Sequence, residues 1–275
     1  MILDGKKVSN EIIENIKYKI EELKLNIGFA VIWIGNDPAS SIYVNNKIKK
    51  CESVGIHTEL YHLEENISEE KVLSLIDDLN NRNDIHGILL QSPIPKHIDV
   101  NKCFNKISDK KDIDGFNVIS TGNLFLGNPS FISCTPKGIM RLFEYYNIDL
   151  SGKNVCIINR SNIVGKPLFH LLIEKDATVT MCHSKTINLN EFTKNADIVI
   201  SAVGKPMFLT ENMINENAIV IDVGISRVDG KVVGDVDFEN VSKKASYITP
   251  VPGGVGPMTI AMVLENILEG VIKNG

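Results

Sequence analysis

Short, uninterrupted apolar segments alternate along this chain with segments of helical periodicity. The segment Phe29–Gly35 reads FAVIWIG, a second apolar run follows at Ala218–Ile221, and further buried strands are expected at Ile85–Leu90, Lys153–Ile158 and Ala218–Val223. Such runs, without polar alternation, are typical of strands buried on both faces, as in a parallel sheet. Because helical patterns of about ten to fifteen residues separate many of the strands, the sequence predicts βαβ units and an α/β fold. Further strands are expected at 58–63, 178–182 and 197–203.

Helices are predicted from apolar stripes and from capping residues. In the first helix, Val8, Ile12, Ile16 and Ile20 recur on one side. The other expected helices are 41–54 with Ser40 or Ser41 as cap, 68–82, a short helix capped by Asp99, 135–146 with Thr135 as cap and Pro136 at its first position, 164–174, and 258–272.

The polar segment 147–152 is the expected domain junction, because the strand–helix pattern starts again after it. We therefore expect two α/β domains. The first comprises residues 1–135, with a mostly parallel sheet, and is completed by the C-terminal helix 256–275. The second comprises residues 136–255 and is a Rossmann-like, doubly wound domain.

Charge, hydropathy and cysteine content exclude several classes of protein. The formal net charge is −5, so the chain lacks the basic excess that nucleic-acid binding needs. No apolar run approaches the ~18–20 residues of a membrane span, and the N-terminus does not resemble a signal peptide. The five cysteines are widely spaced and include no C-x-x-C pair. The sequence therefore predicts a cytoplasmic protein with neither a disulfide framework nor a metal site, and with no nucleic-acid or membrane partner.

The segment Asn159–Pro167 reads NRSNIVGKP and lies between a predicted strand and a predicted helix. Doubly wound folds hold phosphate groups on backbone N–H groups at this position. The segment lacks the G-x-G-x-x-G pattern of dinucleotide sites, and Arg160 stands where a P-loop would have its first glycine. From these residues alone, an ordinary βα loop and a nucleotide site both remain open.

Two further features favour NADP as the cofactor. The second strand of this domain ends in CHSKT (182–186), without the acid that binds the ribose 2′-hydroxyl of NAD. Arg160 and Ser184 can instead donate hydrogen bonds to a 2′-phosphate. Another strand ends at Asp222, and Gly224 just after it would let the backbone approach a flat ring closely.

In the first half of the chain, Tyr43 and Lys47 are four residues apart and share a helix face. They form either a solvated surface pair or part of a site. Gln91 follows a buried strand, and Pro93 and Pro95 stiffen the loop after it. Since ligands of open α/β sheets bind at the carboxyl ends of strands, Gln91 is either a substrate contact or a loop residue bonded to its own backbone.

Two segments have an unusual composition. Lys110–Phe116 contains two acids and two lysines. It is either a solvated loop or presents a carboxylate to a ring that carries N–H donors. Pro250–Thr259 has three prolines and three glycines in ten residues. It forms either a rigid linker or a wall shared by a cofactor and a substrate.

Taken together, these segments resemble the bifunctional methylenetetrahydrofolate dehydrogenase/methenyltetrahydrofolate cyclohydrolase family. The resemblance extends from Asp4 to the last helix and follows the order of the family's motifs. Its most specific segments are DPASSIYVNNK (37–47), Gln91 with its two prolines, KDIDGF (111–116), CTPKG (134–138), RSNIVGKP (160–167), CHSKT (182–186) and PVPGGVGPMT (250–259).

The resemblance implies two reactions. Hydride passes from 5,10-methylenetetrahydrofolate to NADP⁺, and water then opens the methenyl cation to 10-formyltetrahydrofolate. Lys47 would be the acid/base group of the hydrolysis, Gln91 would tune it by a hydrogen bond, Tyr43 would stack on the folate, and Asp114 would hold the pterin ring.

The resemblance also implies the cofactor site and the assembly. Because hydride transfer needs both ligands in contact, we expect an active-site cleft between the two domains. The family is typically a homodimer without a metal. The NADP site would comprise Asn159, Arg160, Ser161, Ser184 and Ile225, and the substrate would also contact Pro252, Gly253 and Gly254.

The chain departs from the family pattern in places. Asn159 stands where the family often has glycine, Ser92 stands where leucine is usual, and residues 117–127 match loosely. The four proposed catalytic residues are all present, so we expect both activities. The alternatives are an amino-acid- or shikimate-type NADP dehydrogenase that uses Lys47 on a hydroxy acid, and a non-catalytic NADP-binding protein.

Overall fold

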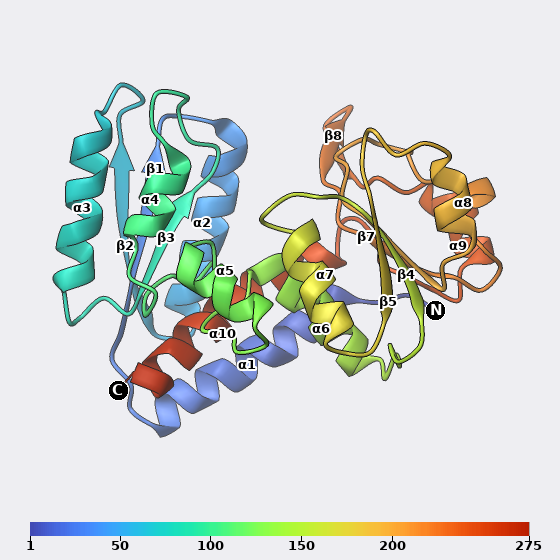
Figure 1. Cartoon of the computed structure of the whole chain (residues 1–275). Coiled ribbons are helices and arrows are strands. Elements are labelled where there is room, and N and C mark those ends of the chain that lie inside the picture. The colour runs from blue at the N-terminus through green and yellow to red at the C-terminus, as the bar shows by residue number, and fades with distance from the viewer. Residues whose placement is uncertain (275) are drawn as a thin grey trace. The chain divides into compact units, whose positions relative to one another are not determined.

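The computed structural model describes residues 1–274, apart from the side chains of residues 38, 39 and 274 (Figure 1). The chain forms two compact units. The three-stranded unit comprises Glu11–Cys134 and Ile260–Gly275, and the five-stranded unit comprises Met1–Asn10 and Thr135–Thr259. Both sheets are parallel, so the expectation of two α/β units with mostly parallel sheets is confirmed. The domain boundaries at 135/136 and 255/256 stay a prediction.

The three-stranded sheet has the order β2-β1-β3. Strand β1 (Ile27–Ile34) lies between β2 (Ile56–Leu63) and β3 (Gly87–Gln91). All residues of β1 are buried, as its uninterrupted apolar sequence predicts. The register places Trp33 beside Gln91 of β3 and His62 of β2. These three residues therefore form one row across the sheet, near its carboxyl end.

Helices cover both faces of this sheet. Helices α3 (Glu69–Asn81) and α4 (Val100–Lys106) pack on the face formed by Ala30, Ile32 and Ile34 of β1. Since side chains alternate along a strand, Trp33 and Gln91 face the opposite side, which α2 (Pro38–Ser53) covers. On that side the Trp33 indole stacks on the His62 imidazole, with ring centroids 4.0 Å apart and an interplanar angle of 4°.

Helix α10 (Val255–Asn274) begins in one unit and ends in the other, as does α1 (Gly5–Glu22). Its segment Val255–Lys273 is long and apolar enough to cross a membrane, so the expectation that no segment reaches this length is wrong. More than half of that segment, 56%, is buried inside the structure. Such burial is typical of the core helix of a globular protein, and length and composition alone are weak evidence for a membrane span.

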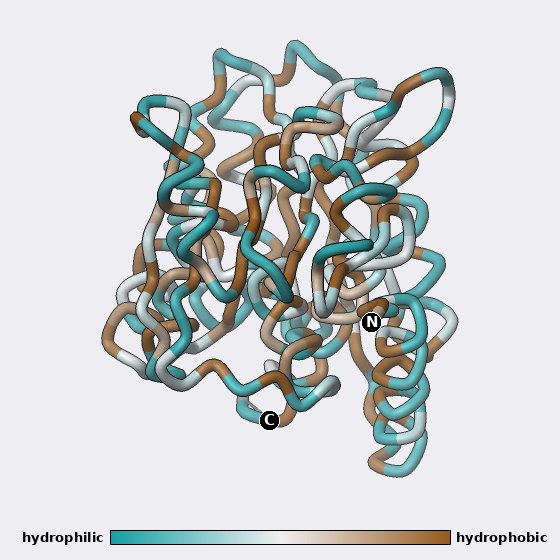
Figure 2. Tube along the Cα trace, turned by 90° about the vertical axis from the view of Figure 1, so that its right-hand side faces the viewer, coloured by the Kyte–Doolittle hydropathy of each residue, from teal (hydrophilic) through white to brown (hydrophobic). Residues whose placement is uncertain are grey.

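The five-stranded sheet has the order β10-β7-β6-β4-β5 and is parallel throughout. Helix α7 follows β4, and a two-stranded antiparallel hairpin, β8-β9, follows β7. Figure 2 shows brown, hydrophobic stretches along the strands and teal, hydrophilic ones toward the outer turns. The elements are β4 (Asn154–Ile158), α7 (Gly165–Ile173), β5 (Thr178–Cys182), α8 (Leu189–Lys194), β6 (Ile198–Ser201), β7 (Ile219–Asp222), β8 (Ser226–Val228), β9 (Lys231–Val233), α9 (Phe238–Lys244) and β10 (Tyr247–Ile248).

Several predicted helix starts are wrong. Asp37, rather than Ser40 or Ser41, caps α2, and its Oδ2 accepts the Ser40 N–H at 2.7 Å. Helix α6 (Cys134–Tyr145) begins one residue before Thr135, so Thr135 lies inside the helix. Asp99 caps α4 as expected. Three short helices, α5 (Val118–Phe125), α8 and α9, were not predicted, because six to eight residues contain too few turns to show a period.

The charged segment after α4 is mostly structural. Lys111 Nζ donates to the carbonyls of Leu79, Asn80 and Arg82 at 2.6–3.0 Å and so holds the end of α3. Asp112 is buried, and its carboxylate accepts the backbone N–H groups of Phe116 and Asn117. Of the two acids in this segment, only Asp114 therefore remains for a site.

Asp112 predicts a measurable pH dependence of stability. Burial raises its pKa from its ordinary value to about 7. The unfolded chain releases this proton near pH 4, so folding gains stability from Asp112 at low pH and loses it as the pH rises to about 7. Relative to Asp112→Asn, the wild type should lose up to about 1.4 kcal/mol of unfolding free energy per pH unit in this window. Urea unfolding at pH 5, 6, 7 and 8 measures this, and parallel curves for the two proteins would contradict it.

Candidate active site

Lys47 and Gln91 contact each other directly in the three-stranded unit. Lys47 belongs to α2, and Gln91 is the last residue of β3. Lys47 Nζ donates a hydrogen bond to Gln91 Oε1 at 3.1 Å, and both side chains are half-buried. Lys47 is therefore not a solvated surface lysine. The pair lies at the carboxyl edge of a parallel sheet, where such folds bind ligands.

The orientation of the Gln91 amide is set by the loop that follows it. Gln91 Nε2 donates to the Ser92 carbonyl at 2.6 Å, and Ser40 Oγ lies 3.3 Å from the same oxygen. Because Nε2 points to an acceptor, Oε1 is left to accept from Lys47. The contact uses the backbone of residue 92, so the serine that replaces a usual leucine there does not alter it.

Asp114 lies within electrostatic range of Lys47. Burial raises the pKa of the Asp114 carboxyl, while the charge of Lys47 and a contact with Cys134 lower it. Cys134 Sγ lies 3.6 Å from Asp114 Oδ1. The carboxylate is half-buried and so keeps surface for a ligand. Asp114, Lys47 and Gln91 thus form one group, although they come from three separate segments.

Tyr43 lies one helical turn before Lys47 on α2. The residue is 37% exposed, and its position one turn before Lys47 places it on the same side of the helix as that lysine. An exposed ring is suited to stacking on a flat ligand. Stacking of Tyr43 on the folate stays a prediction.

Asn159 organises the loop between β4 and α7 in the five-stranded unit. Its Oδ1 accepts the backbone N–H groups of Ser161 and Gly165 at 2.8 and 3.1 Å, and the Ser161 hydroxyl at 2.7 Å. Its Nδ2 donates to the carbonyl of Ala202 beyond β6 at 2.6 Å. The asparagine side chain therefore satisfies N–H groups that a glycine at this position would leave open. It also ties two neighbouring strands together.

Arg160 and Ser184 follow neighbouring strands. Ile158 of β4 pairs with Cys182 of β5, and Arg160 and Ser184 each come two residues after this last pair. Both are exposed, and within residues 1–274 the structure gives neither side chain a hydrogen bond or an ion pair. A guanidinium and a hydroxyl without internal partners fit a phosphate dianion. The arrangement fits the 2′-phosphate of NADP.

Two buried aspartates hold the strand ends near Gly224. Asp222 accepts the N–H groups of Gly224, Asp235 and Val236 at 2.9–3.0 Å. Asp235 is fully buried and accepts from Ser201 Oγ and from the N–H groups of Val203 and Lys205. Burial, and secondarily the charge of Asp235, raise the pKa of Asp222 to about 6. These carboxylates fix the loops after β6 and β7.

Gly224 lies directly against a protein carboxylate, and the expected approach of its backbone to a flat ring stays a prediction. A Cβ on Gly224 would lie 2.1 Å from Asp235 Oδ1, so the missing side chain makes room for this carboxylate. Ile225 is 44% exposed, and its Cδ1 lies 3.7 Å from where a Cβ on Gly256 would be. Ile225 therefore borders the start of α10 and keeps an apolar surface free for a ring.

The proline- and glycine-rich segment is only partly a loop, because α10 begins at Val255. Gly254 is buried, and a Cβ on Gly5 would lie 1.9 Å from its carbonyl oxygen. Gly253 accepts the Lys6 N–H at 2.8 Å, and Pro252 is exposed. These three residues belong to the five-stranded unit, whereas Tyr43, Lys47, Gln91 and Asp114 belong to the three-stranded unit. Their contact with substrate stays a prediction.

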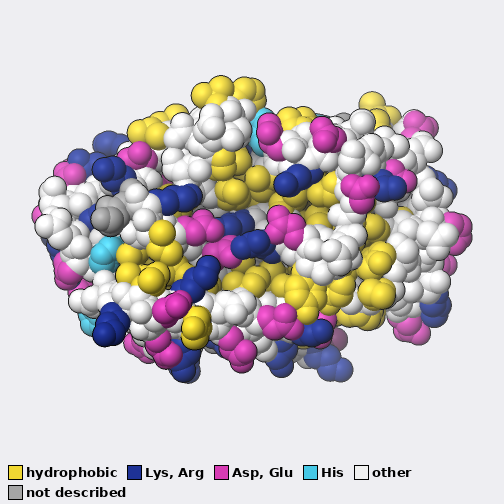
Figure 3. All heavy atoms as spheres, turned by 90° about the horizontal axis from the view of Figure 1, so that it is seen from below, with side chains coloured by type: hydrophobic (Ala, Val, Ile, Leu, Met, Phe, Trp, Pro, Cys, Tyr) yellow, Lys and Arg dark blue, Asp and Glu magenta, His cyan; other side chains and the backbone are white. Residues whose placement is uncertain are grey.

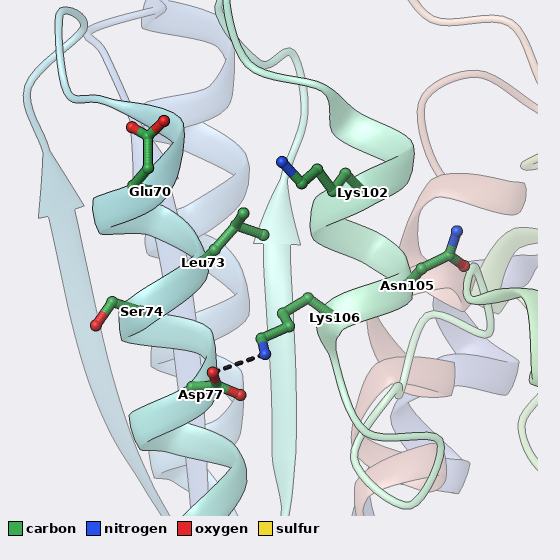
Figure 4. Close-up of a pocket in the computed structure, with 7 residues that line it drawn as sticks. All are labelled: Glu70, Leu73, Ser74, Asp77, Lys102, Asn105 and Lys106. Carbon is green, nitrogen blue, oxygen red and sulfur yellow. Dashed lines mark ion pairs between the residues drawn. The ribbon is translucent and has the colours of Figure 1, made fainter.

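A surface pocket lies between α3 and α4, away from these residues. Figure 4 shows lysines of α4 directed toward acids of α3 across it. Lys106 Nζ lies 2.6 Å from Asp77 Oδ2. The pocket is on the face of the sheet opposite Gln91, and its two lysines are paired with the acids Glu69 and Asp77. It is therefore not a candidate for the reacting ligands.

Sequence reasoning missed Asp37, Asp235 and Cys134 as supports of these sites. Asp37 could have been found, since an aspartate before Pro38 is a common helix start. Asp235 and Cys134 act on residues far away in the sequence, so no local pattern identifies them. Within the described residues no group of three or more His, Cys, Asp or Glu side chains could hold a metal ion.

Comparison with known proteins finds two profiles of one family along the chain. The profile described as "Tetrahydrofolate dehydrogenase/cyclohydrolase, catalytic domain" matches residues 3–114, and "Tetrahydrofolate dehydrogenase/cyclohydrolase, NAD(P)-binding domain" matches residues 133–274. The "Bifunctional protein FolD" of Nautilia profundicola is 52% identical over 272 residues, which cover 98% of this chain and 96% of the relative.

Solved structures are equally similar. The bifunctional FolD enzyme of Campylobacter jejuni superposes with a TM-score of 0.98 and is 49% identical, covering 100% of this chain and 99% of that one. The Trypanosoma brucei methylenetetrahydrofolate dehydrogenase-cyclohydrolase, solved with NADP cofactor and an inhibitor, has a TM-score of 0.95 and 33% identity. The coverage there is 100% and 98%.

Gly165 provides a test of the β4–α7 loop. A Cβ at this position would lie 2.4 Å from the Asn159 carbonyl oxygen and 2.8 Å from Asn159 Oδ1, so Gly165→Ala must displace the loop. We expect weaker NADP binding by about 1–2 kcal/mol, the range of a modest steric overlap. Titration calorimetry with NADP measures this.

Gly122→Ala in α5 is the matched control, because its new Cβ would meet nothing within 4 Å. It should leave NADP binding unchanged and stabilise the protein by ~0.5–1 kcal/mol. Equal NADP affinities for Gly165→Ala and the wild type would contradict the role of the loop.

Proposed function

Because the chain belongs to the tetrahydrofolate dehydrogenase/cyclohydrolase family, we propose that Lys47, Gln91, Tyr43 and Asp114 carry out its folate chemistry. The protein is a bifunctional one-carbon folate enzyme that uses NADP. It oxidises 5,10-methylenetetrahydrofolate to the methenyl cation and hydrolyses that cation to 10-formyltetrahydrofolate. The observation that supports the residue roles best is the Lys47–Gln91 hydrogen bond.

In the hydrolysis, Lys47 manages the protons. Water adds to the methenyl carbon and loses a proton, and the C–N bond to one ring nitrogen then breaks as that nitrogen is protonated. An ammonium ion beside the cation would be repelled, so the addition step requires the neutral amine of Lys47. The Gln91 oxygen accepts one N–H of this amine, which directs the nitrogen lone pair away from Gln91.

Asp114 and Tyr43 orient the substrate. A carboxylate accepts hydrogen bonds only, so Asp114 is suited to the N–H groups at the edge of the pterin ring. A pterin ring held by Asp114 then has its one-carbon unit near the amine of Lys47. Tyr43, exposed one turn before Lys47, stacks on the flat ring system. Pro252, Gly253 and Gly254 provide backbone surface for the same ligand.

The cofactor accepts the hydride when it is bound. We assign its 2′-phosphate to Arg160 and Ser184, which are exposed and each lie two residues beyond the end of a neighbouring strand. Asn159 and Ser161 hold the loop on which the phosphates lie, and Ile225 supplies an apolar surface for the nicotinamide.

We propose a cytoplasmic homodimer that has no nucleic-acid or membrane partner. Large apolar side chains gather in patches on one face of the molecule (Figure 3). Val118, Ile119, Phe125 and Leu126, on and after α5, are each more than half exposed, with values of 51–72%. Exposure of several large apolar residues in one segment is typical of a surface that another chain covers. The alternatives of a shikimate-type dehydrogenase and of a non-catalytic protein do not agree with the family to which the chain belongs.

Lys47→Met should abolish the hydrolysis and leave NADP binding unchanged. Methionine keeps much of the length of the side chain and removes the amine. The rate is measured as the loss of methenyltetrahydrofolate absorbance, and NADP binding is measured by calorimetry. Equal hydrolysis rates for the variant and the wild type would contradict the role of Lys47.

Arg160→Ala should weaken NADP binding much more than NAD binding. Loss of one charge-assisted hydrogen bond to the 2′-phosphate removes ~1.5–3 kcal/mol, and NAD has no such phosphate. Dissociation constants for both nucleotides measure the difference. An unchanged ratio of NADP to NAD affinity would refute the contact.

A further inference from the structure

Asn266 is a fully buried amide in the middle of an apolar helix. It lies on α10 with 0% exposure, and Val263, Ile267 and Leu268 around it belong to the core. Burial of an amide without hydrogen bonds is unfavourable by ~1–3 kcal/mol. An apolar residue would fill the same volume without that penalty. The polar group at this position therefore needs a reason.

The Asn266 amide joins the two segments that carry Asp114 and Cys134. Its Nδ2 donates to the carbonyl of Ile113 at 2.7 Å and to the carbonyl of Ile132 at 2.8 Å. It also lies 3.6 Å from Cys134 Sγ. Ile113 directly precedes Asp114, and Ile132 comes two residues before Cys134, whose thiol contacts Asp114. The amide thus holds two otherwise separate backbone segments at a fixed distance from each other.

Close packing makes this arrangement rigid. Gly115, directly after Asp114, has φ +66°, and a Cβ there would lie 2.9 Å from the Phe131 carbonyl oxygen. Gly270, one turn after Asn266, packs against the Phe131 ring, since a Cβ there would lie 2.9 Å from its Cζ. Asp114 is therefore fixed on one side by the Asn266 bond and on the other by backbone contact.

We propose that Asn266 is a positioning residue for the folate chemistry. Through the carbonyls of Ile113 and Ile132 and through Cys134, it sets the position of the Asp114 carboxylate. This inference rests on the proposed role of Asp114. The hydrogen-bond chain runs from α10 through Cys134 Sγ to Asp114 Oδ1. A shift of this backbone would misplace the carboxylate relative to Lys47.

The experiment is a double-mutant cycle of Asn266→Leu and Asp114→Asn, measured in both reactions. Asn266→Leu keeps the volume and removes both N–H donors. Each single variant should raise the KM for the folate roughly ten-fold or more. If Asn266 acts through Asp114, the second substitution in the Asp114→Asn background should add less than about two-fold. The NADP dissociation constant should stay within about two-fold of the wild type.

Asn80→Ala is the matched control. Asn80 also bridges two backbone segments of the same unit, by Nδ2 to the Lys106 carbonyl at 2.8 Å and by Oδ1 from the Ser108 N–H at 2.9 Å. It should lower the melting temperature and leave the folate KM unchanged. Should Asn266→Leu fail to fold, Cys134→Ala tests the same chain. Loss of the thiol should raise the Asp114 pKa and move the acid limb of the KM profile to higher pH.

The outcomes separate the two hypotheses. A raised KM in Asp114→Asn with an unchanged KM in Asn266→Leu overturns the positioning role and leaves the proposed function intact. Multiplicative effects in the double variant overturn it as well, because they indicate a general loss of structure. An unchanged KM in Asp114→Asn contradicts the proposed site itself.

Discussion

The hydrogen bond from Lys47 Nζ to Gln91 Oε1 joins the helix after the first strand to the end of the third strand. It is possible only because β1 and β3 are parallel neighbours and because Asp37 starts α2 directly after β1. The parallel sheet therefore does more than provide a core. It brings a lysine, an amide and, through the segment after α4, a carboxylate to the same edge, where one small ligand can contact all three.

Both units hold their site loops with polar side chains that are buried or half-buried. Asn159, Asp222 and Asp235 secure the strand ends of the five-stranded unit, and Asn266 secures the Asp114 segment of the other. Each makes two or more hydrogen bonds to backbone groups, so its burial is compensated. Loops fixed in this way need little rearrangement when a ligand binds, because the binding groups are already in place before the ligand arrives.

The sequence predicts the parts of this structure that depend on local pattern. Buried strands such as β1 and β4, and long helices such as α3, follow from periodicity alone. The short helices α5, α8 and α9 and the β8-β9 hairpin contain too few residues for a period, and the hairpin was missed. The family motifs indicated Lys47, Gln91 and Asp114. Asn266 and Asp235 could not be identified, because a lone polar residue acquires its role only from partners distant in the sequence.

The Trp33 indole stacks on the His62 imidazole, and both residues lie in the same row across the sheet as Gln91. Trp33 is the single tryptophan of the chain. Its light emission therefore arises from one place, the strand next to Gln91, where the indole stacks on an imidazole. The protein thus carries an optical probe at the carboxyl edge of this sheet, which needs no label.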